Sequence, residues 1–362
     1  MLDSYKIWFE KYGAHILTNN SSALTSDFVS QNFSQVAWTL SNKQQYKQVK
    51  YVRSKRYLIL TSMVGRSIKI FSADEVFENY SPNIEKVTLP LYTRHFKHQV
   101  VEVCINPNEK YAFFSLTDFG KEGLKDRVFC LDLNSFQKVF TIDTRGKWSK
   151  YIAYHPDDLL VISNWHSNDL SIIDVRNLDQ PRVVQIIPCG VSPRGIAFTS
   201  DGNLGLVAGF YSRNLTYLKY IPKKRRFSIE KISAPFDYPN YSGNMRHVVI
   251  DRKDENAYIS NMGRNLIHRV DLSKKEIVES YPCGSHPNTI VLSDNSKYLA
   301  VSCRKSNIIC LLDTATGRIQ SIVDTGPMPT GLDFNRINQK LYSLYNTNFE
   351  DDSIVCTKLF LP

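Results

Sequence analysis

The sequence predicts an all-β protein, a seven-bladed β-propeller, from three observations. A unit of short apolar strand, polar turn, second apolar strand, polar turn and third strand recurs along the 362 residues. The ends of the seven first strands follow one another at intervals of 42 to 53 residues: Val52, Ile105, Tyr154, Phe198, Ile250, Leu292 and Phe334. Four-stranded propeller blades repeat at about 40–45 residues, so the longer units carry loop insertions. Apolar and polar residues alternate within the strands, and Gly, Asn, Asp and Pro separate them, as in antiparallel sheet.

Aspartates end several of the third strands, namely Asp132, Asp174, Asp271 and Asp313. A short carboxylate at this place can accept hydrogen bonds from the backbone of the turn that follows, as in DTATGR at 313–318. We therefore interpret these residues as structural turn residues rather than as catalytic acids.

The last unit ends at its third strand, SIVCTKLFLP, and lacks a fourth. The segment SQVAWTLSN at 34–42 resembles the fourth-strand stretches of other units, such as RIQSIVDTG. We predict that this N-terminal strand completes the last blade, because closing the ring leaves no edge strand open. The predicted organisation is an N-terminal helix and linker over residues 1–33 and a propeller over 34–362.

Within residues 1–33, Tyr5, Trp8, Phe9 and Tyr12 have helical spacing, and Gly13 follows them. The spacing predicts a short amphipathic helix with an aromatic stripe. This stripe either packs on the side of the propeller or, through Trp8 and Phe9, docks a partner or a second protomer.

Composition limits the class of protein. Hydrophobic residues make up 42% and charged residues 22%, which excludes a disordered, collagenous or coiled-coil chain. No apolar run reaches the roughly 18 residues of a membrane span, and the start of the chain lacks a secretory pattern, so we expect a cytoplasmic protein. The seven cysteines form no C-x-x-C pair and are interpreted as buried, reduced thiols. The net charge of +10 points to acidic partners.

Three segments carry a more specific pattern: CGVSPRGIAFTSDG (189–202), CGSHPNTIVLSDNSKYLAVS (283–302) and TGPMPTGLDF (325–334). With LLDTATGRIQSIV, they resemble the YVTN-type seven-bladed β-propeller repeat family, over roughly residues 35–362. The resemblance implies the fold. It does not identify a function, because this repeat encodes packing and turns.

The first strand of each blade is expected to start beside the central channel. Counting four residues back from each strand marker gives the predicted channel-facing residues Gln48, Val101, Lys150, Arg194, Arg246, Asn288 and Thr330. Three of them are cations, and like charges around a narrow channel repel one another. The neighbouring positions offer only Glu102 and His247, so the pattern predicts an anionic ligand or partner.

Loops between second and third strands are expected on the same face. They contribute aromatic and cationic side chains, namely Trp165, His166, Tyr211, Arg213, Arg264, Arg304 and Lys305. Aromatic planes beside guanidinium groups suit sugar rings, bases or phosphorylated ligands. Two insertions, 117–127 and 233–243, are expected to extend from this face, either for recognition or as covers of the channel.

The function favoured by these patterns is non-catalytic recognition of an acidic protein surface, a carbohydrate or a phosphorylated small molecule. The alternative is a lactonase- or lyase-like enzyme, which is implied by related propellers and would use His247 or Glu102 with Arg194 and Arg246. The sequence has no G-x-S-x-G, P-loop or H-E-x-x-H motif, and its eight histidines are dispersed, so we expect no metal and no cofactor. The basic turn KKRR at 223–226 is a solvated turn or a nonspecific attractor of nucleic acid or anionic lipid, and no nucleic-acid motif accompanies it.

Overall fold

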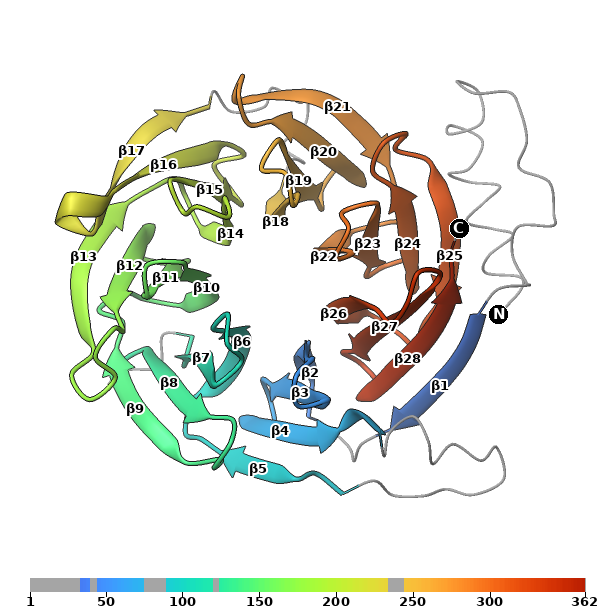
Figure 1. Ribbon diagram of the computed structural model, residues 1–362, viewed down its shortest axis with the longest axis horizontal. Helices are drawn as coiled ribbons and strands as arrows, with labels where there is room; N and C mark the ends of the chain where they lie inside the picture. Colours follow the sequence, from blue (N-terminus) through green and yellow to red (C-terminus); the bar gives the residue numbers. More distant parts are fainter. Residues whose placement is uncertain (1–32, 40–43, 75–88, 120–123, 234–243, 362) are drawn as a thin grey trace.

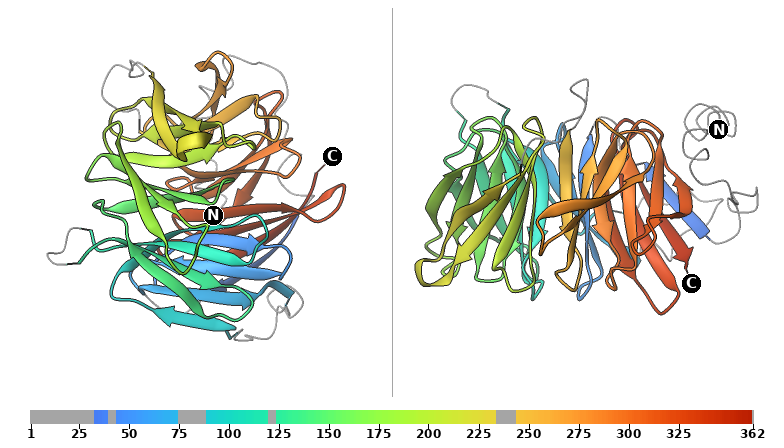
Figure 2. Two further views of the ribbon diagram at one scale, coloured as in Figure 1. Left: turned by 60° about the vertical axis from the view of Figure 1, so that its left-hand side comes forward. Right: turned by 90° about the horizontal axis from the view of Figure 1, so that it is seen from above.

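A computed structural model describes residues 33–39, 44–74, 89–119, 124–233 and 244–361. Figure 1 shows seven four-stranded antiparallel sheets arranged as blades around a central channel, which confirms the predicted fold class. Seen from the side in Figure 2, the strands run between two faces of a ring, and the loops emerge on these faces. The predicted helix with Trp8 and Phe9, and most of the 233–243 insertion, lie outside the described residues.

The strands of each blade follow one another from the channel outward. Blade 1 contains β2 (Tyr46–Val52), β3 (Tyr57–Ser62), β4 (Ser67–Ser72) and β5 (Tyr92–His95). Blade 2 contains β6 (Gln99–Ile105), β7 (Tyr111–Thr117), β8 (Arg127–Asp132) and β9 (Lys138–Asp143). Blade 3 contains β10 (Ser149–His155), β11 (Leu159–Asn164), β12 (Asp169–Asp174) and β13 (Arg182–Pro188). Blade 4 contains β14 (Pro193–Phe198), β15 (Leu204–Gly209), β16 (Leu215–Ile221), the short 3-10 helix η3 (Pro222–Lys224) and β17 (Arg226–Ile232).

Three blades complete the ring. Blade 5 contains β18 (Met245–Ile250), β19 (Asn256–Asn261), β20 (Leu266–Asp271) and β21 (Glu276–Pro282). Blade 6 contains β22 (Pro287–Leu292), β23 (Tyr298–Cys303), β24 (Ile308–Asp313) and β25 (Ile319–Asp324). Blade 7 contains β26 (Pro329–Arg336), β27 (Leu341–Asn348), β28 (Ser353–Phe360) and, as its outer strand, β1 (Phe33–Thr39).

Blade 7 is built from both ends of the chain. β1 pairs antiparallel with β28, from Phe33 opposite Leu359 to Thr39 opposite Ser353 (Figure 1). The predicted closing strand is therefore confirmed, and it covers the edge that β28 would otherwise expose.

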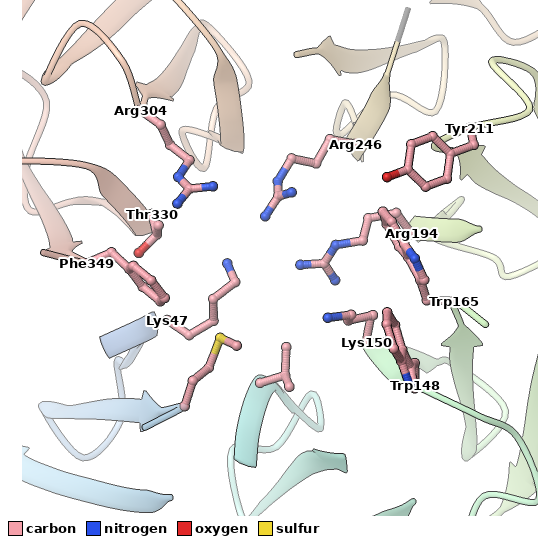
Figure 3. A pocket seen from close by; sticks show the side chains of 12 residues that line it. Lys47, Trp148, Lys150, Trp165, Arg194, Tyr211, Arg246, Arg304, Thr330 and Phe349 are labelled. Atoms are coloured by element: carbon pink, nitrogen blue, oxygen red, sulfur yellow. The ribbon is translucent and has the colours of Figure 1, made fainter. Parts of the chain in front are cut away.

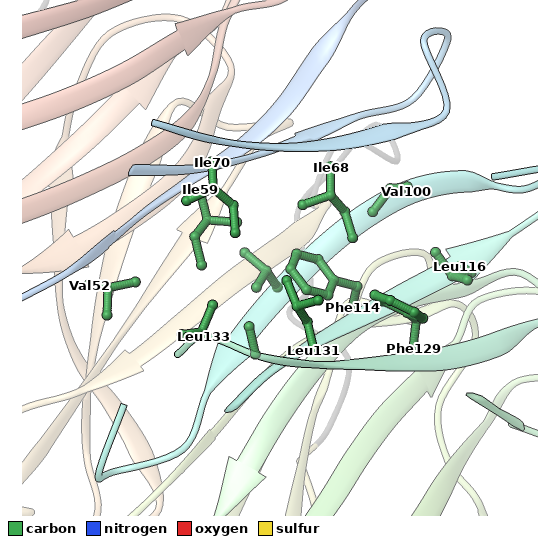
Figure 4. Packing of buried hydrophobic residues seen from close by; sticks show 12 residues of the cluster. Val52, Ile59, Ile68, Ile70, Val100, Phe114, Leu116, Phe129, Leu131 and Leu133 are labelled. Carbon is green, nitrogen blue, oxygen red and sulfur yellow. The ribbon is translucent and has the colours of Figure 1, made fainter. Parts of the chain in front are cut away.

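The hydrophobic core lies between neighbouring blades. Between blades 1 and 2, Ile59 and Ile68 face Phe114 and Phe129, and all four are at least 99% buried (Figure 4). Similar clusters follow between successive sheets around the ring. The second strand of each blade is covered on both faces, and every residue of β11 is buried. This packing makes the inner strands a rigid frame for the channel.

The strand-ending aspartates act as predicted. The carboxylate of Asp132 accepts hydrogen bonds from the backbone N–H groups of Asn134 and Ser135, and that of Asp313 accepts them from Ala315 and Thr316. All seven cysteines are free; Cys104 and Cys189 are half-buried, and the other five are buried. The described part of the chain holds no helix with the length and hydropathy that a bilayer crossing requires.

Candidate functional site

Bulges in the inner strands set the direction of the channel-facing side chains. The pairing of inner strand with second strand shifts register between Ser149 and Ile152 in blade 3. The same shift occurs between Pro193 and Ile196 in blade 4 and between Met245 and Val248 in blade 5. The three predicted cations, Lys150, Arg194 and Arg246, all lie inside these irregularities. A bulge re-aims a side chain locally, and here it turns the cations toward the axis.

Hydroxyl groups of the second strands hold the backbone at these bulges. Ser115 Oγ accepts a hydrogen bond from Glu102 N at 3.1 Å and donates one to the carbonyl of Lys150 at 2.8 Å. In the next blade, Ser163 Oγ accepts from Tyr151 N at 3.1 Å and donates to the carbonyl of Arg194 at 2.8 Å. Each hydroxyl therefore joins two neighbouring blades, and it fixes the backbone from which a channel cation extends.

A glycine lets two inner strands approach closely. A Cβ on Gly195 would lie 2.8 Å from His247 Cα and 2.9 Å from the carbonyl oxygen of Arg246, closer than real Cβ atoms come. Because both contacts are with backbone, no side-chain movement relieves them. The absence of a side chain at Gly195 thus brings β14 and β18 together, and with them Arg194 and Arg246.

These side chains meet in a cavity of about 300 Å³ at one mouth of the channel (Figure 3). It is lined by Lys47, Met63, Val101, Trp148, Lys150, Trp165, Arg194, Tyr211, Arg246, Arg304, Thr330 and Phe349. All seven blades contribute to this lining, through their inner strands and the adjoining loops. The cavity therefore exists only in the closed ring.

The cavity is strongly cationic. Five cations line it: Lys47, Lys150, Arg194, Arg246 and Arg304. In the described part of the chain, Glu102 is the carboxylate within ion-pair distance of any of them. Its Oε1 lies 3.0 Å from Arg194 Nη2 and 3.9 Å from Lys47 Nζ. One carboxylate thus faces five cations, and a large positive excess remains.

The pKa values of these side chains reflect their burial and the excess of positive charge around them. Burial, together with the charges of Arg194 and Arg246, lowers the pKa of Lys150 to about 6. Burial and the neighbouring guanidinium groups of Arg194 and Arg304 lower the pKa of Arg246 well below its usual range. Burial also lowers the pKa of Lys47, although Glu102 opposes the shift. The charged forms are therefore destabilised here, and an anion placed among them would relieve the repulsion.

Two guanidinium groups of the cavity lining have donors without a hydrogen-bond partner among the described residues. Arg194 is 4% exposed, yet its Nη1 makes no hydrogen bond, and Nε of Arg304 makes none either. Buried donors are nearly always satisfied in folded proteins. Unused donors at a cationic cavity indicate a place for an acceptor that comes from outside the chain.

Aromatic rings form the wall of the cavity beside Lys150. Its Nζ lies 3.7 Å from the ring centroid of Phe119, 5.8 Å from that of Trp148 and 5.9 Å from that of Trp165. Trp165 in turn meets Tyr211 edge-on, with centroids 5.5 Å apart. Across the cavity, the guanidinium of Arg304 lies 5.7 Å from the ring centroid of Phe349.

Not every residue predicted for the site lines the cavity. Lys150, Arg194, Arg246, Trp165, Tyr211 and Arg304 do so. His166 is exposed and packs against Trp148, with ring centroids 5.4 Å apart. Asn288 is fully buried, and its Nδ2 donates to the carbonyl of Thr330 at 3.1 Å. Neither His166 nor Asn288 is among the lining residues.

The two residues considered for catalysis, His247 and Glu102, are buried and interact with other residues of the protein. His247 is 8% exposed; its Nδ1 accepts from Ile290 N at 3.2 Å, and its Nε2 lies 2.9 Å from Tyr151 Oη. Burial and the charges of Arg194, Arg246 and Lys47 lower the pKa of His247 to about 3, so the imidazole is neutral at physiological pH. Neither His247 nor Glu102 lines the cavity.

Sequence reasoning missed four lining residues. In blade 1 the cavity residue is Lys47 and not the predicted Gln48. In blade 5, the marker Ile250 pairs with Ala257, the second residue of β19, whereas in blade 1 the marker Val52 pairs with Tyr57, the first residue of β3. Counting four residues back from Val52 therefore ends one residue too far along the chain. Met63 and Phe349 directly follow the second strands of blades 1 and 7, as Trp165 and Arg304 do in their blades, and this shared position could have revealed them. Trp148 precedes its strand, and no repeat signal marks it.

The basic turn on the opposite face is partly structural. Arg225, in the hairpin between β16 and β17, lies 2.5 Å from Asp157 and 3.6 Å from Asp174. Lys223 and Lys224 are exposed. In the described part of the chain, no three His, Cys, Asp or Glu side chains lie close enough together to hold a metal ion.

Comparisons with known proteins agree with the architecture. No protein-family model matches the chain. Antigen Lp49 of Leptospira interrogans is 32% identical over 233 residues, which cover 59% of this chain and 49% of that protein. The chain therefore spans about half the length of this relative. A functionally unknown protein from Desulfotomaculum acetoxidans has a crystal structure that is similar with a TM-score of 0.62, at 13% identity, over 80% of this chain and 91% of that one. This second likeness concerns the fold alone.

Proposed function

We propose that the protein is a non-catalytic recognition propeller that binds an anionic group at the channel mouth. The observation that carries this proposal is the convergence of Arg194, Arg246 and Arg304 on one cavity in which Glu102 supplies the compensating charge. Guanidinium groups bind carboxylate and phosphate through paired hydrogen bonds. The unused donors of Arg194 and Arg304 are available for such bonds.

We extend the proposal to the repeat family of the propeller and to its cellular compartment. We propose a YVTN-type propeller, supported by the three repeat segments quoted above. We also propose that it works in the cytoplasm as a protein- or ligand-binding scaffold, which is in keeping with seven free cysteines. An acidic protein surface, a carbohydrate acid or a phosphorylated compound would each offer the required charge.

The enzymatic alternative has less support. A general base must reach a substrate proton. His247 keeps Nδ1 on a backbone N–H and Nε2 against Tyr151, outside the lining of the cavity. The described lining of the cavity therefore includes neither of the two bases, His247 and Glu102, that the lactonase- or lyase-like hypothesis names.

Titration with sulfate at low ionic strength, followed by calorimetry, tests the proposal. We expect saturable binding that weakens as sodium chloride is added, because the interaction is between charges. The Arg246→Ala variant should lose binding at least tenfold. The matched control is Arg318→Ala, which removes an exposed arginine from the opposite face. Equal binding by wild type and Arg246→Ala, or no binding by either, would overturn the proposal.

A further inference from the structure

We infer that the ligand is a small phosphate monoester whose organic part is a ring. This inference rests on the proposed anion site and names the class of ligand that would fill it. It is drawn from two groups of lining residues labelled in Figure 3. Arg194, Arg246 and Arg304 are called the guanidinium half, and Trp148, Trp165 and Tyr211, which follow one another along one wall beside Arg194, are called the aromatic half.

The guanidinium half calls for more than one negative charge. Glu102 pairs with Arg194, and among the described residues no carboxylate lies within ion-pair distance of Arg246 or Arg304, so a monocarboxylate would pair with one of these two guanidinium groups and leave the other unpaired. A phosphate monoester carries a charge of about −1.5 to −2 near neutral pH and three acceptor oxygens. Three acceptor oxygens match three guanidinium groups, two of which hold unused buried donors.

The aromatic half is rigid because other rings support it. Trp165 lies against Phe210, with centroids 4.7 Å apart, and meets Tyr211 edge-on. Trp148 meets Phe119 edge-on with centroids 5.5 Å apart. Trp148 has a left-handed backbone conformation, with φ at 57°, as Gln45, Ser192, His286 and Met328 have at the same position before their inner strands, so the repeated turn sets the place of this ring.

The two halves are too close to serve separate ligands. Lys150 lies between them, with its Nζ over Phe119 and its pKa lowered by burial and by the charges of Arg194 and Arg246. A cavity of about 300 Å³ stands at the lower end of the range for small-molecule sites. This size favours a metabolite over an acidic protein surface, which would reach the cavity only through single side chains. A ring that stacks on Trp165 would place an attached phosphate toward Arg194, Arg246 and Arg304.

Calorimetry with five probes tests the inference on the full chain: inorganic phosphate, glucose 6-phosphate, AMP, glucose and adenosine. We expect one of the two ring phosphates to bind at least tenfold more tightly than inorganic phosphate, and the unphosphorylated rings not to bind. Preference for glucose 6-phosphate or for AMP distinguishes a sugar ring from a base.

Variants separate the two halves of the site. Trp165→Ala should reduce the affinity for the ring phosphate to that for inorganic phosphate, and it should leave phosphate binding unchanged. Tyr211→Ala, at a residue that is 59% exposed, should reduce ring-phosphate binding even if Trp165→Ala folds poorly. Phe360→Ala, which removes a 55% exposed aromatic from β28, is the matched control and should change neither.

The possible failures are distinguishable. If inorganic phosphate binds as tightly as both ring phosphates, and the aromatic variants change nothing, the inference is wrong and the anion site stands. If a phosphoserine peptide, titrated as a further probe, binds and both small ring phosphates fail, the ligand is a protein and the inference is also wrong. If no phosphate compound or sulfate binds, the proposed function itself fails.

Discussion

The carboxylate of Glu102 and the guanidinium of Arg194 lie 3.0 Å apart, although 92 residues separate them in sequence. Glu102 belongs to blade 2 and Arg194 to blade 4, and both side chains are at least 93% buried. Because Glu102 also faces Lys47 of blade 1, one acid connects three blades at the channel. Glu102 is therefore placed to limit repulsion among the cations of the cavity.

Replacing this acid by an amide should destabilise the protein and strengthen anion binding. Glu102→Gln keeps an acceptor oxygen for Arg194 but removes its countercharge, and leaving one charge of a buried pair uncompensated costs about 3–5 kcal/mol. Denaturant unfolding measures the loss, and added sulfate should restore part of it by mass action. Glu279→Gln, at the exposed pair with Arg269, is the control and should cost under about 1 kcal/mol. Unchanged stability of Glu102→Gln would contradict the assigned role.

Anion binding should take up a proton through Lys150. Burial and the charges of Arg194 and Arg246 lower the pKa of Lys150 to about 6, so the amine is mostly neutral at pH 7.5. A bound dianion raises that pKa, so affinity is highest below pH 6 and falls as the pH rises toward the pKa of the complex. Sulfate is the suitable probe, since it stays doubly charged over this range. Calorimetry in buffers of different ionisation enthalpy should show proton uptake by wild type and none by Lys150→Met; equal uptake by both would assign the proton to another group.

Adding one methyl group at Gly195 should disturb the anion site by separating the strands that carry Arg194 and Arg246. In Gly195→Ala, the new Cβ meets the backbone of His247 and Arg246, so β14 and β18 must separate. Overpacking of this kind costs about 1–3 kcal/mol, and anion affinity should fall because Arg194 and Arg246 move apart. Gly190→Ala is the control, since its Cβ would meet the side chains of Ser212 and Asn214, which can adjust. The prediction fails if Gly195→Ala binds sulfate like wild type.

Removing a connecting hydroxyl should loosen the inner ring. Ser163→Ala leaves Tyr151 N and the carbonyl of Arg194 without this partner, and an unsatisfied buried group costs about 1–3 kcal/mol. Thermal unfolding should report the loss, with a smaller decrease in anion affinity. A substitution at an exposed serine, Ser135→Ala, should be near neutral in both measurements.

The closing strand should be required for stability. A variant that lacks residues 1–39 exposes the edge of β28, and open edges associate with other chains. We expect a lower melting temperature and larger species in size-exclusion chromatography. A variant that lacks only residues 1–32 keeps β1 and is the matched control. If both variants behave like the full chain, the closing strand contributes little.

The sequence by itself determined the number of blades, the strand that closes the ring and the turn function of residues such as Asp132. These features depend on alternation, spacing and turn chemistry, which are local in the chain. Counting back along the inner strands also selected Lys150, Arg194 and Arg246, which line the channel cavity, because one residue per repeat occupies the same position in these strands. The same count gave Gln48 in blade 1, where Lys47 lines the cavity, because the inner and second strands of that blade pair in a register shifted by one residue.

Only the tertiary structure decided how the channel residues interact. Glu102 pairs with Arg194, and His247 forms hydrogen bonds with Tyr151 and Ile290. These contacts join residues that are 43 to 96 positions apart. Such contacts depend on ring curvature, strand bulges and the close approach at Gly195, which sequence spacing does not encode. For the same reason, the sequence revealed a basic channel, whereas the structure decided which cations share a carboxylate and which keep unused donors.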